Sequence, residues 1–463
     1  MAWFRQLSNP SPEGGPKVSL PCRAKRLGWL VLGRSMVNSA QQRSRIWRAA
    51  PALIFFLASI VVPTQAQAQT FKVLHTFHGK DGDAPVGQLV RDKAGNFYGT
   101  TTAGGTGKCQ IGCGTAFKMN EAGKIIWTHS FNGANGWQPL AGLLRDAGGN
   151  LFGTTGLGGD LKCIPPYGCG TVFKLDNVGK KETVLHRFTD RPDGEGPEPL
   201  LVQDPGGNLY GTTWSGGENE AGTVFKINTA GKETILYSFT GGSDGCGPYP
   251  GVILDSAGNL YGTTLIGGAG FGNSGYGVVF KVDASGNETV LHTFGGSDGA
   301  NPDSVLLFAP EGNLYGMTQN GGSSEVCDGG CGTVFELSPQ NGGWSETVLY
   351  SFCSLSDCAD GLQPVRGPLV RDAAGNLYGT TDDGGNYRYC NGDGCGVVFK
   401  LDPAGKETVL HNFTGGADGS GPFAGLTIDS VGILYGAAIS GGDLKCLDNK
   451  NGYGCGVVFK IIP

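Results

Sequence analysis

The chain has 463 residues, of which 84 are glycine and 24 are proline, and charged residues make up only 16% of it. So few charges exclude a disordered, solvating chain, while 39% hydrophobic and 10% aromatic residues are enough for a sizeable core. The glycines recur periodically, which favours one large repeat domain over low-complexity sequence.

The first 68 residues are predicted to be an N-terminal extension that ends in a signal peptide. Three arginines precede the uncharged run AAPALIFFLASIVVP, and the small residues of AQAQ follow it, with cleavage expected after Ala68. The apolar run is too short to favour a membrane span. Met36 would begin a signal of ordinary length, so a start at Met1 or at Met36 fits the sequence. The mature chain is therefore expected to be secreted or extracellular, or periplasmic, without a transmembrane segment.

The charge of the mature part disfavours nucleic acid as a partner. Residues 1–68 hold nine of the 34 basic residues and one of the 40 acidic residues, which leaves 25 basic against 39 acidic residues. A chain with this excess of negative charge repels phosphate backbones.

Residues 69–463 are predicted to form one domain built from seven copies of a single unit. The string GNLYGTTDDGG at 375–385 returns along the chain with small changes. Its aromatic residue marks the centre of each repeat: Tyr98, Phe152, Tyr210, Tyr261, Tyr315, Tyr378 and Tyr435. These positions lie on average about 56 residues apart, near the spacing of kelch-type propellers.

Each copy contains four short runs with strand character and no helical periodicity. In the sixth copy they are residues 368–372, 376–381, 395–401 and 407–413, which we name strands A, B, C and D. Short turns rich in Asp, Pro and Gly join A to B and C to D, as in antiparallel hairpins, whereas the B-to-C and D-to-A loops are long. Seven such units predict an all-β fold, a seven-bladed β-propeller of four-stranded antiparallel blades.

A glycine lies in the middle of every strand B, as Gly379 does in the sixth copy. Because packed sheets cover both faces of this strand, we expect the glycine to leave room for an aromatic ring of a neighbouring blade. The candidate ring is the phenylalanine of the VFK sequence in strand C, from Phe117 to Phe459.

The two ends of the mature chain carry the strands needed to close the ring. Residues 71–77 have the D-type pattern and residues 456–462 have the C-type pattern. The seventh blade thus lacks a D strand, which the N-terminus is predicted to supply. Closure of this kind removes the open sheet edges that a linear array would expose.

The repeat, GNLYGTT…GG…GTVFKL…G.ETVLHSF, resembles the GloVer-type tandem repeat of secreted bacterial proteins. The resemblance covers about residues 71–463. It implies export and a repeat array, and it brings no catalytic residue. Members of this family often carry a sorting or anchoring tail, which this sequence does not show.

Five of the six histidines occupy one position in strand D: His75, His129, His186, His292 and His411. Tyr237 and Tyr350 replace them in the other two blades. A position shared by His and Tyr indicates packing and hydrogen bonding rather than acid–base chemistry, so no catalytic residue is predicted. His78 alone is off the pattern, and no orienting partner for it is evident in the sequence.

Thirteen of the 14 cysteines remain after the leader, and twelve of these form close pairs within loops. Export to an oxidising compartment predicts six local disulfides. They are Cys109–Cys113, Cys163–Cys169, Cys327–Cys331, Cys353–Cys358, Cys390–Cys395 and Cys446–Cys455. A metal site needs three or four converging ligands, whereas each loop offers two and different blades hold their pairs apart, so no metal or other cofactor is predicted. Cys246 is left over, as a free thiol or in an intermolecular bond.

An Asx-Gly pair recurs in the D-to-A loops at Asp81, Asn135, Asp193, Asp244, Asp298, Asp360 and Asp418. A ring of such groups could bind calcium, but no single loop shows the several oxygens that calcium needs. Turn formation is the favoured interpretation. The aspartate that ends strand A, such as Asp372, is likewise expected to shape the A-to-B turn.

The candidate ligand-binding surface is the face that carries the long loops, because the sequence varies most there. Its proposed binding residues are Trp137, Tyr249, Trp214 and Phe423. Trp137 and Tyr249 are expected to occupy comparable places before strand A and to reach toward the channel mouth. Such rings could stack on a sugar or a peptide, or could equally plug the channel.

The favoured hypothesis is a secreted, non-catalytic propeller that binds or scaffolds an extracellular glycan or protein. The alternative is an extracellular propeller hydrolase or lyase acting on a polysaccharide or peptide, since propellers host both kinds of function. The sequence shows no off-repeat cluster of His, Glu, Asp or Lys that would favour the enzyme.

Overall fold

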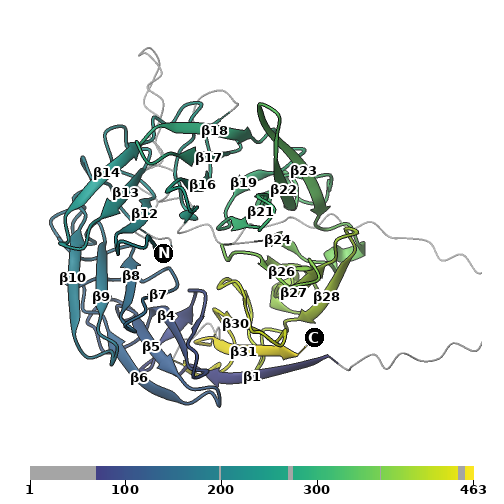
Figure 1. Ribbon diagram of the computed structural model, residues 1–463. Coiled ribbons are helices and arrows are strands. Elements are labelled where there is room, and N and C mark those ends of the chain that lie inside the picture. The colour runs from purple at the N-terminus through teal and green to yellow at the C-terminus, as the bar shows by residue number, and fades with distance from the viewer. Residues whose placement is uncertain (1–68, 198–199, 269–274, 365, 447–453, 463) are drawn as a thin grey trace, which may run out of the picture.

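The computed structural model describes residues 69–197, 200–268, 275–364, 366–446 and 454–462. The predicted signal peptide and extension, residues 1–68, lie outside the described residues. Seven antiparallel sheets stand around a common axis, with strand D on the outside of each blade (Figure 1). The predicted seven-bladed β-propeller is thereby confirmed. Within the described ranges, no helix has the length and apolar character needed to cross a membrane.

The strands follow one another blade by blade. Blade one contains β2 (Asp83–Pro85), β3 (Val90–Arg91), β4 (Phe97–Ala103), β5 (Thr115–Met119) and β6 (Ile125–Ser130). Blade two contains β7 (Leu144–Arg145), β8 (Leu151–Thr155), β9 (Thr171–Leu175) and β10 (Glu182–Arg187). Blade three contains β11 (Val202–Gln203), β12 (Leu209–Thr213), β13 (Thr223–Ile227) and β14 (Glu233–Ser238). Blade four contains β15 (Val252–Leu254), β16 (Leu260–Thr264), β17 (Val278–Val282) and β18 (Glu288–Thr293).

The remaining three blades complete the ring. Blade five contains β19 (Ala300–Pro302), β20 (Leu307–Phe308), β21 (Leu314–Asn320), β22 (Thr333–Gln340) and β23 (Gly343–Ser351). Blade six contains β24 (Leu362–Pro364), β25 (Val370–Arg371), β26 (Leu377–Asp383), β27 (Val397–Leu401) and β28 (Glu407–Asn412). Blade seven contains β29 (Thr427–Ile428), β30 (Leu434–Ala438), β31 (Val457–Ile462) and β1 (Thr70–Thr76). Two short 3-10 helices, η1 (Ser356–Cys358) and η2 (Cys390–Gly392), lie in loops.

The A-to-B turn is built as the sequence predicts. In blade six, Asp372 Oδ1 accepts hydrogen bonds from the backbone N–H groups of Ala374 and Asn376, both at 2.9 Å. Its Oδ2 accepts from the Asn376 side chain at 2.7 Å and from the Tyr378 hydroxyl at 2.9 Å. One carboxylate thus joins the aspartate, the asparagine and the tyrosine of the repeat into a single unit.

Blade five preserves this arrangement with a different acid. Ala309 stands at the aspartate position there, and Glu336 replaces the lysine of the VFK sequence. The Tyr315 hydroxyl donates to Glu336 Oε1 at 2.9 Å, so the carboxylate has moved from strand A's end to strand C.

The glycine in strand B does make room for the strand C phenylalanine, but within its own blade. Gly379 is the register partner of Phe399, and a Cβ on Gly379 would lie 2.6 Å from the Phe399 ring. The prediction of a ring from a neighbouring blade is wrong. Strand C pairs directly with strand B, and the strand C phenylalanine places its ring over the glycine opposite it. Any larger residue at this position would displace the ring.

Phenylalanine pairs join each blade to the next. The phenylalanine that follows strand D lies edge-to-face against the strand C phenylalanine of the next blade, with ring centroids 5.0–5.3 Å apart. The seven pairs are Phe77–Phe117, Phe131–Phe173, Phe188–Phe225, Phe239–Phe280, Phe294–Phe335, Phe352–Phe399 and Phe413–Phe459. All these rings are fully buried. Each pair contributes about 1 kcal/mol beyond its buried area.

The ring is closed by the N-terminal strand, as predicted. Strand β1 pairs antiparallel with β31, from Thr70 opposite Ile462 to Thr76 opposite Val457. In Figure 1 the purple β1 accordingly lies beside the yellow β31. The first and last described strands therefore share one sheet, and blade seven has its four strands.

A chain that begins at residue 78 is expected to be far less stable than one that begins at residue 69. The truncation removes β1, exposes the edge of β31 and deletes the Phe77 ring, whose loss alone should cost about 3 kcal/mol. Solubility and melting temperature, measured by light scattering and calorimetry, should both fall. Equal melting temperatures for the two chains would contradict closure by strand exchange.

Candidate functional site

A pocket lies at the axis of the ring, where residues that precede strand A converge from all seven blades. It contains about 470 Å³ of empty space, part of it open to solvent. Blades one to seven contribute in turn Val86 and Gln88, Leu140, Leu200, Tyr249, Asp303, Arg366, and Phe423. Several of these residues follow the proline that ends each D-to-A loop. The repeat thus places one variable segment per blade at the same central point.

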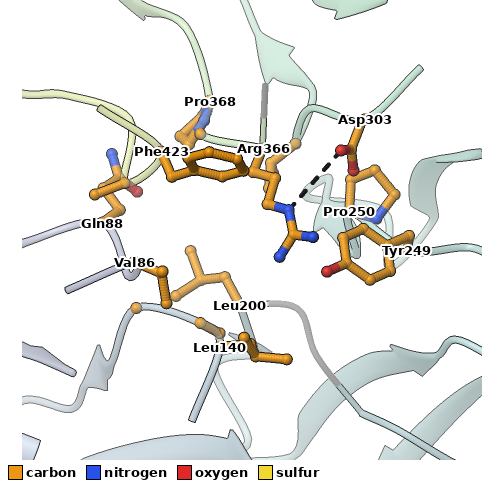
Figure 2. A pocket seen from close by; sticks show the side chains of 15 residues that line it. Val86, Gln88, Leu140, Leu200, Tyr249, Pro250, Asp303, Arg366, Pro368 and Phe423 are labelled. Atoms are coloured by element: carbon orange, nitrogen blue, oxygen red, sulfur yellow. Dashed lines mark ion pairs between the residues drawn. The ribbon is translucent and has the colours of Figure 1, made fainter. Parts of the chain in front are cut away.

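Arg366 is the most prominent polar group of this pocket. Its guanidinium carbon lies 4.6 Å from the centroid of the Tyr249 ring and 5.4 Å from that of Phe423. Figure 2 shows the arginine between these two rings, with Val86, Leu140 and Leu200 across the pocket. Cation–π contacts of this kind hold a guanidinium in place and are worth about 1 kcal/mol each.

Two carboxyl groups lie near the arginine. Arg366 Nε lies 3.9 Å from Asp303 Oδ2, and Asp303 is buried. Asp382 in β26 also interacts with both groups. Burial holds the pKa of Asp382 well above its ordinary value, the charges of Asp383 and Asp303 act in the same direction, and Arg366 opposes them. The pocket therefore brings the Arg366 guanidinium close to two carboxyl groups. Asp303 pairs with the arginine, and Asp382 has a raised pKa.

The four predicted binding residues separate into two groups. Tyr249 and Phe423 line the axial pocket. Trp214 is only 4% exposed and packs edge-to-face against the Tyr249 ring at 5.2 Å, so it supports the pocket from behind. Trp137 does not line the pocket. It packs 5.9 Å from Tyr167, beside the blade-one and blade-two core.

The expectation that Trp137 and Tyr249 occupy comparable places is wrong. Trp137 forms a bridge with Leu157, and in blade four the corresponding bridge joins Cys246 to Ile266. Tyr249 stands three residues further along, after the proline, where the chain has turned toward the axis. The spacing to the recurring proline would have shown the difference, because Trp137 lies two residues before Pro139 and Tyr249 directly follows Pro248.

Sequence reasoning did not single out Arg366 or Asp303. Both lie within the segment between the recurring proline and strand A, where the sequence varies from blade to blade. Comparison of that segment across the seven copies would have marked them, together with Glu198, as its charged members.

The strand D histidines have structural partners, in agreement with the packing role predicted for them. His75, His186 and His292 each place Nε2 2.9 Å from the D-to-A loop aspartate, and His411 does so at 3.2 Å. Tyr237 and Tyr350 donate to the equivalent aspartates. His129 pairs with Glu182 instead, because its own loop carries Asn135. The off-pattern His78 is exposed and pairs with Asp443 at 2.9 Å.

A glutamate from the next blade approaches most of these pairs. Four such glutamates, Glu233, Glu288, Glu346 and Glu407, begin a strand D or lie in it, and each has a buried Oε1 without a hydrogen-bond partner. Burial raises the pKa of each to about 7, and a neighbouring aspartate adds to the shift. In blades one and seven, Ile125 and Phe71 occupy the glutamate position. Phe71 stacks on His411 at 3.7 Å.

The structure joins the cysteines of the long loops in six disulfides: Cys109–Cys113, Cys163–Cys169, Cys327–Cys331, Cys353–Cys358, Cys390–Cys395 and Cys446–Cys455. Cys246 is fully buried and is disulfide-bonded as well. Of the two states left open for Cys246, a free thiol and an intermolecular bond, the first does not hold, because no cysteine in the described part of the chain is free.

The fold and its repeated unit define a β-propeller repeat protein. The chain belongs to the Gloeobacter/Verrucomicrobia repeat family, whose model matches residues 58–271 and 234–448. A comparison with curated proteins found no match.

Solved structures of similar shape come from several kinds of protein. The extracellular domain of a putative hybrid two-component system from B. thetaiotaomicron matches 84% of this chain at 13% identity with a TM-score of 0.48. This chain spans 41% of that protein's length. A putative 6-phosphogluconolactonase from Bacteroides uniformis matches 77% of this chain and 89% of its own length, at 15% identity and a TM-score of 0.44.

The four glutamates with raised pKa values should make stability depend on pH. Their neutral form is favoured in the folded state, so the stabilisation is complete below about pH 4.5 and is lost as the pH rises toward 7. Urea unfolding midpoints should fall between these pH values. Changing all four residues to glutamine should flatten the profile, whereas the exposed Glu218→Gln should not. A midpoint that stays constant in the parent chain would contradict the assignment.

Trp214→Ala should destabilise the fold rather than act on a ligand alone. Removing a nearly buried indole from between blades three and four is expected to cost about 3 kcal/mol of unfolding free energy. Tyr389→Ala, at an exposed ring of the same face, should cost less than 1 kcal/mol. Chemical denaturation of both variants distinguishes the two cases, and equal small effects would show that Trp214 is not part of the core.

Proposed function

We propose that this chain is a secreted, non-catalytic propeller that binds or scaffolds an extracellular glycan or protein at its axial pocket. The proposal rests on the contrast between the strands and the pocket. Seven copies keep nearly the same strands, whereas the residue after the recurring proline is Val86, Leu140, Tyr249, Asp303 or Phe423 in the blades where it is described. Specific recognition needs such asymmetry, and the strands do not offer it.

The chemistry of the pocket supports a ligand with both apolar and polar surface. Val86, Leu140 and Leu200 supply an apolar wall, and the Arg366 guanidinium supplies several donors in a fixed fork. The faces of Tyr249 and Phe423 near Arg366 are occupied by the arginine. These rings therefore favour positioning of the guanidinium over direct stacking on a sugar, which was one of the roles that the sequence left open.

The disulfides support action outside the cytoplasm. Six bridges, each closing a loop of a few residues, form and persist in oxidising compartments. They restrict the conformations of the long loops in which they lie.

A second candidate function is an extracellular hydrolase or lyase acting on a polysaccharide or peptide. The observation that favours it is the pair Asp303 and Asp382 near Arg366, because a carboxyl group with a raised pKa can serve as a general acid. Incubation of the mature chain with polysaccharides and peptides distinguishes the two functions. New chain ends that are lost in Asp382→Asn would establish the enzyme, and binding without products would favour the module.

Binding to a panel of soluble polysaccharides and unstructured peptides should depend on the two pocket rings. Tyr249→Ala and Phe423→Ala should each weaken the affinity about fivefold, because each removes a cation–π contact worth about 1 kcal/mol that positions Arg366. Calorimetric titration measures this change, with Tyr389→Ala as a matched control outside the pocket. A ligand whose affinity survives both pocket substitutions would place recognition elsewhere on the protein.

A further inference from the structure

Blade five differs from the other blades in its cysteines. It alone carries one cysteine pair in its B-to-C loop and a second pair in the D-to-A loop that follows. The first pair is Cys327 and Cys331, and the second is Cys353 and Cys358. The sequence gives no sign that the two loops meet.

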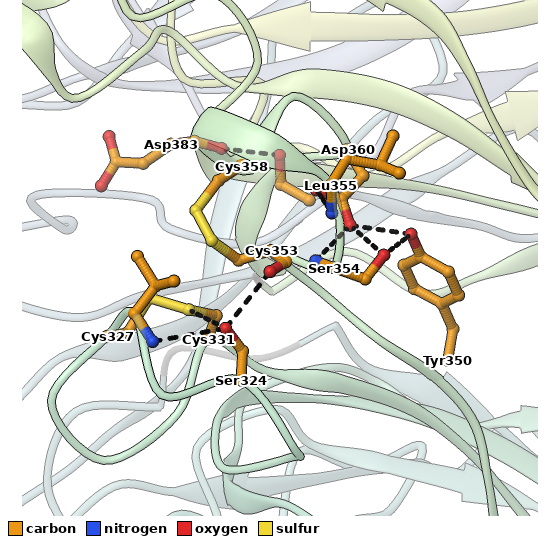
Figure 3. Close-up of a disulfide and its surroundings, with 12 residues drawn as sticks. Ser324, Cys327, Cys331, Tyr350, Cys353, Ser354, Leu355, Cys358, Asp360 and Asp383 are labelled. Atoms are coloured by element: carbon orange, nitrogen blue, oxygen red, sulfur yellow. Dashed lines mark hydrogen bonds between the residues drawn. A yellow bond between two sulfur atoms is a disulfide. The ribbon is translucent and has the colours of Figure 1, made fainter. Parts of the chain in front are cut away.

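The structure brings the two pairs together, as Figure 3 shows. The sulfur atoms of Cys331, Cys353 and Cys358 all lie within 4.8 Å of one another. Cys327 Sγ is bonded to Cys331 Sγ at 2.04 Å, so the fourth sulfur adjoins the same cluster. Each loop still offers only two cysteines, but the expectation that the pairs lie apart does not hold for these two loops.

The surroundings hold the two loops in this arrangement. The Ser324 hydroxyl donates to the Cys353 carbonyl oxygen at 3.2 Å, and its oxygen lies 3.5 Å from Cys331 Sγ. On the other loop, Asp360 accepts from the Tyr350 hydroxyl at 2.7 Å and from the Ser354 backbone N–H at 2.8 Å. The hydrogen bond from Ser324 to the Cys353 carbonyl oxygen and the hydrogen bonds to Asp360 do not involve sulfur atoms, so they can keep the loops in place when the disulfides are reduced.

We propose that Cys327, Cys331, Cys353 and Cys358 form a zinc-type metal site when their two disulfides are reduced. A tetrahedral Zn²⁺ with Zn–S distances of about 2.3 Å needs sulfurs about 3.8 Å apart, which is within the spread of this cluster. The spacings C-x₃-C and C-x₄-C, each from one tight turn, are those of structural zinc sites. Cys331, Cys353 and Cys358 are at most 6% exposed, so little water competes for the ion.

The disulfide-bonded state and the metal-bound state exclude each other, because both use the same four sulfur atoms. A thiol or phosphine reductant breaks both S–S bonds, and four electrons and four protons convert the four sulfurs to thiols. Zn²⁺ then binds four thiolates and releases the four protons to solvent. Reoxidation expels the metal and restores the disulfides. The cluster is thus a metal site whose occupancy depends on the redox state of the surroundings.

The test uses the mature chain, reduced without oxygen by a phosphine and titrated with Co²⁺ as a spectroscopic probe. We expect one Co²⁺ per chain, with the absorption of a tetrahedral tetrathiolate site that is bleached by Zn²⁺. The double variants Cys327→Ser/Cys331→Ser and Cys353→Ser/Cys358→Ser should each lose this absorption. Cys109→Ser/Cys113→Ser removes a pair with the same separation of four residues and should retain it.

Two results would overturn the proposal. One is the absence of stoichiometric cobalt binding in the reduced parent chain, and the other is equal loss of binding in the Cys109/Cys113 control. Should reduction of all the bridges unfold the parent, a variant with the four other local pairs changed to alanine is produced in a reducing cytoplasm with added zinc. One bound zinc per folded chain is expected, and a folded chain without zinc refutes the site.

Discussion

The edge-to-face contact between two phenylalanines at each blade boundary is the interaction on which the whole ring depends. One ring follows strand D of a blade, and the other lies on strand C of the next, where a strand B glycine leaves space for it. The contact fixes both the distance and the orientation of successive sheets. Because the contact recurs seven times with nearly the same geometry, the seven blades are arranged evenly and the last blade lies beside the first. Strand β1 can then pair with β31 and complete blade seven.

This regular framework separates stability from recognition. The turn aspartates, strand glycines and paired phenylalanines are among the positions that the repeat keeps, and all three serve the fold. The D-to-A loops are constrained at one end by the contact between strand D and the Asx residue. After the recurring proline they approach the axis, where their residues differ. Variation at that point changes the pocket without changing the contacts between blades, which is why Arg366 can sit between Tyr249 and Phe423 in an otherwise symmetric ring.

The sequence alone was enough to predict blade number, strand order and ring closure. These follow from a repeated local pattern and from the mismatch between D-type residues 71–77 and C-type residues 456–462. Contacts across the repeat were harder to foresee. The sequence predicts a ring from a neighbouring blade over Gly379, because residue identity gives no information on the conformation of the Phe399 side chain. Trp137 and Tyr249 were expected to occupy comparable places, but their places in the repeat differ by three residues. Only Tyr249 lies after the proline, where the chain has turned toward the axis. The convergence of four cysteines in blade five depends on two loops that are distant in sequence.

Closure by β1 also orders the events of biosynthesis. Blades one to six are each made from one contiguous stretch of chain, so they can fold as they emerge, with little loop entropy to overcome. Blade seven pairs residue 70 with residue 462, so strand β1, which is synthesised before the blades, must wait for β31, which is synthesised after them. Until then β1 is an unpaired strand beside the blades that have already folded. A partly made chain therefore exposes an incomplete blade, and a protein that guards such edges, or a protease that recognises them, could distinguish unfinished from finished molecules.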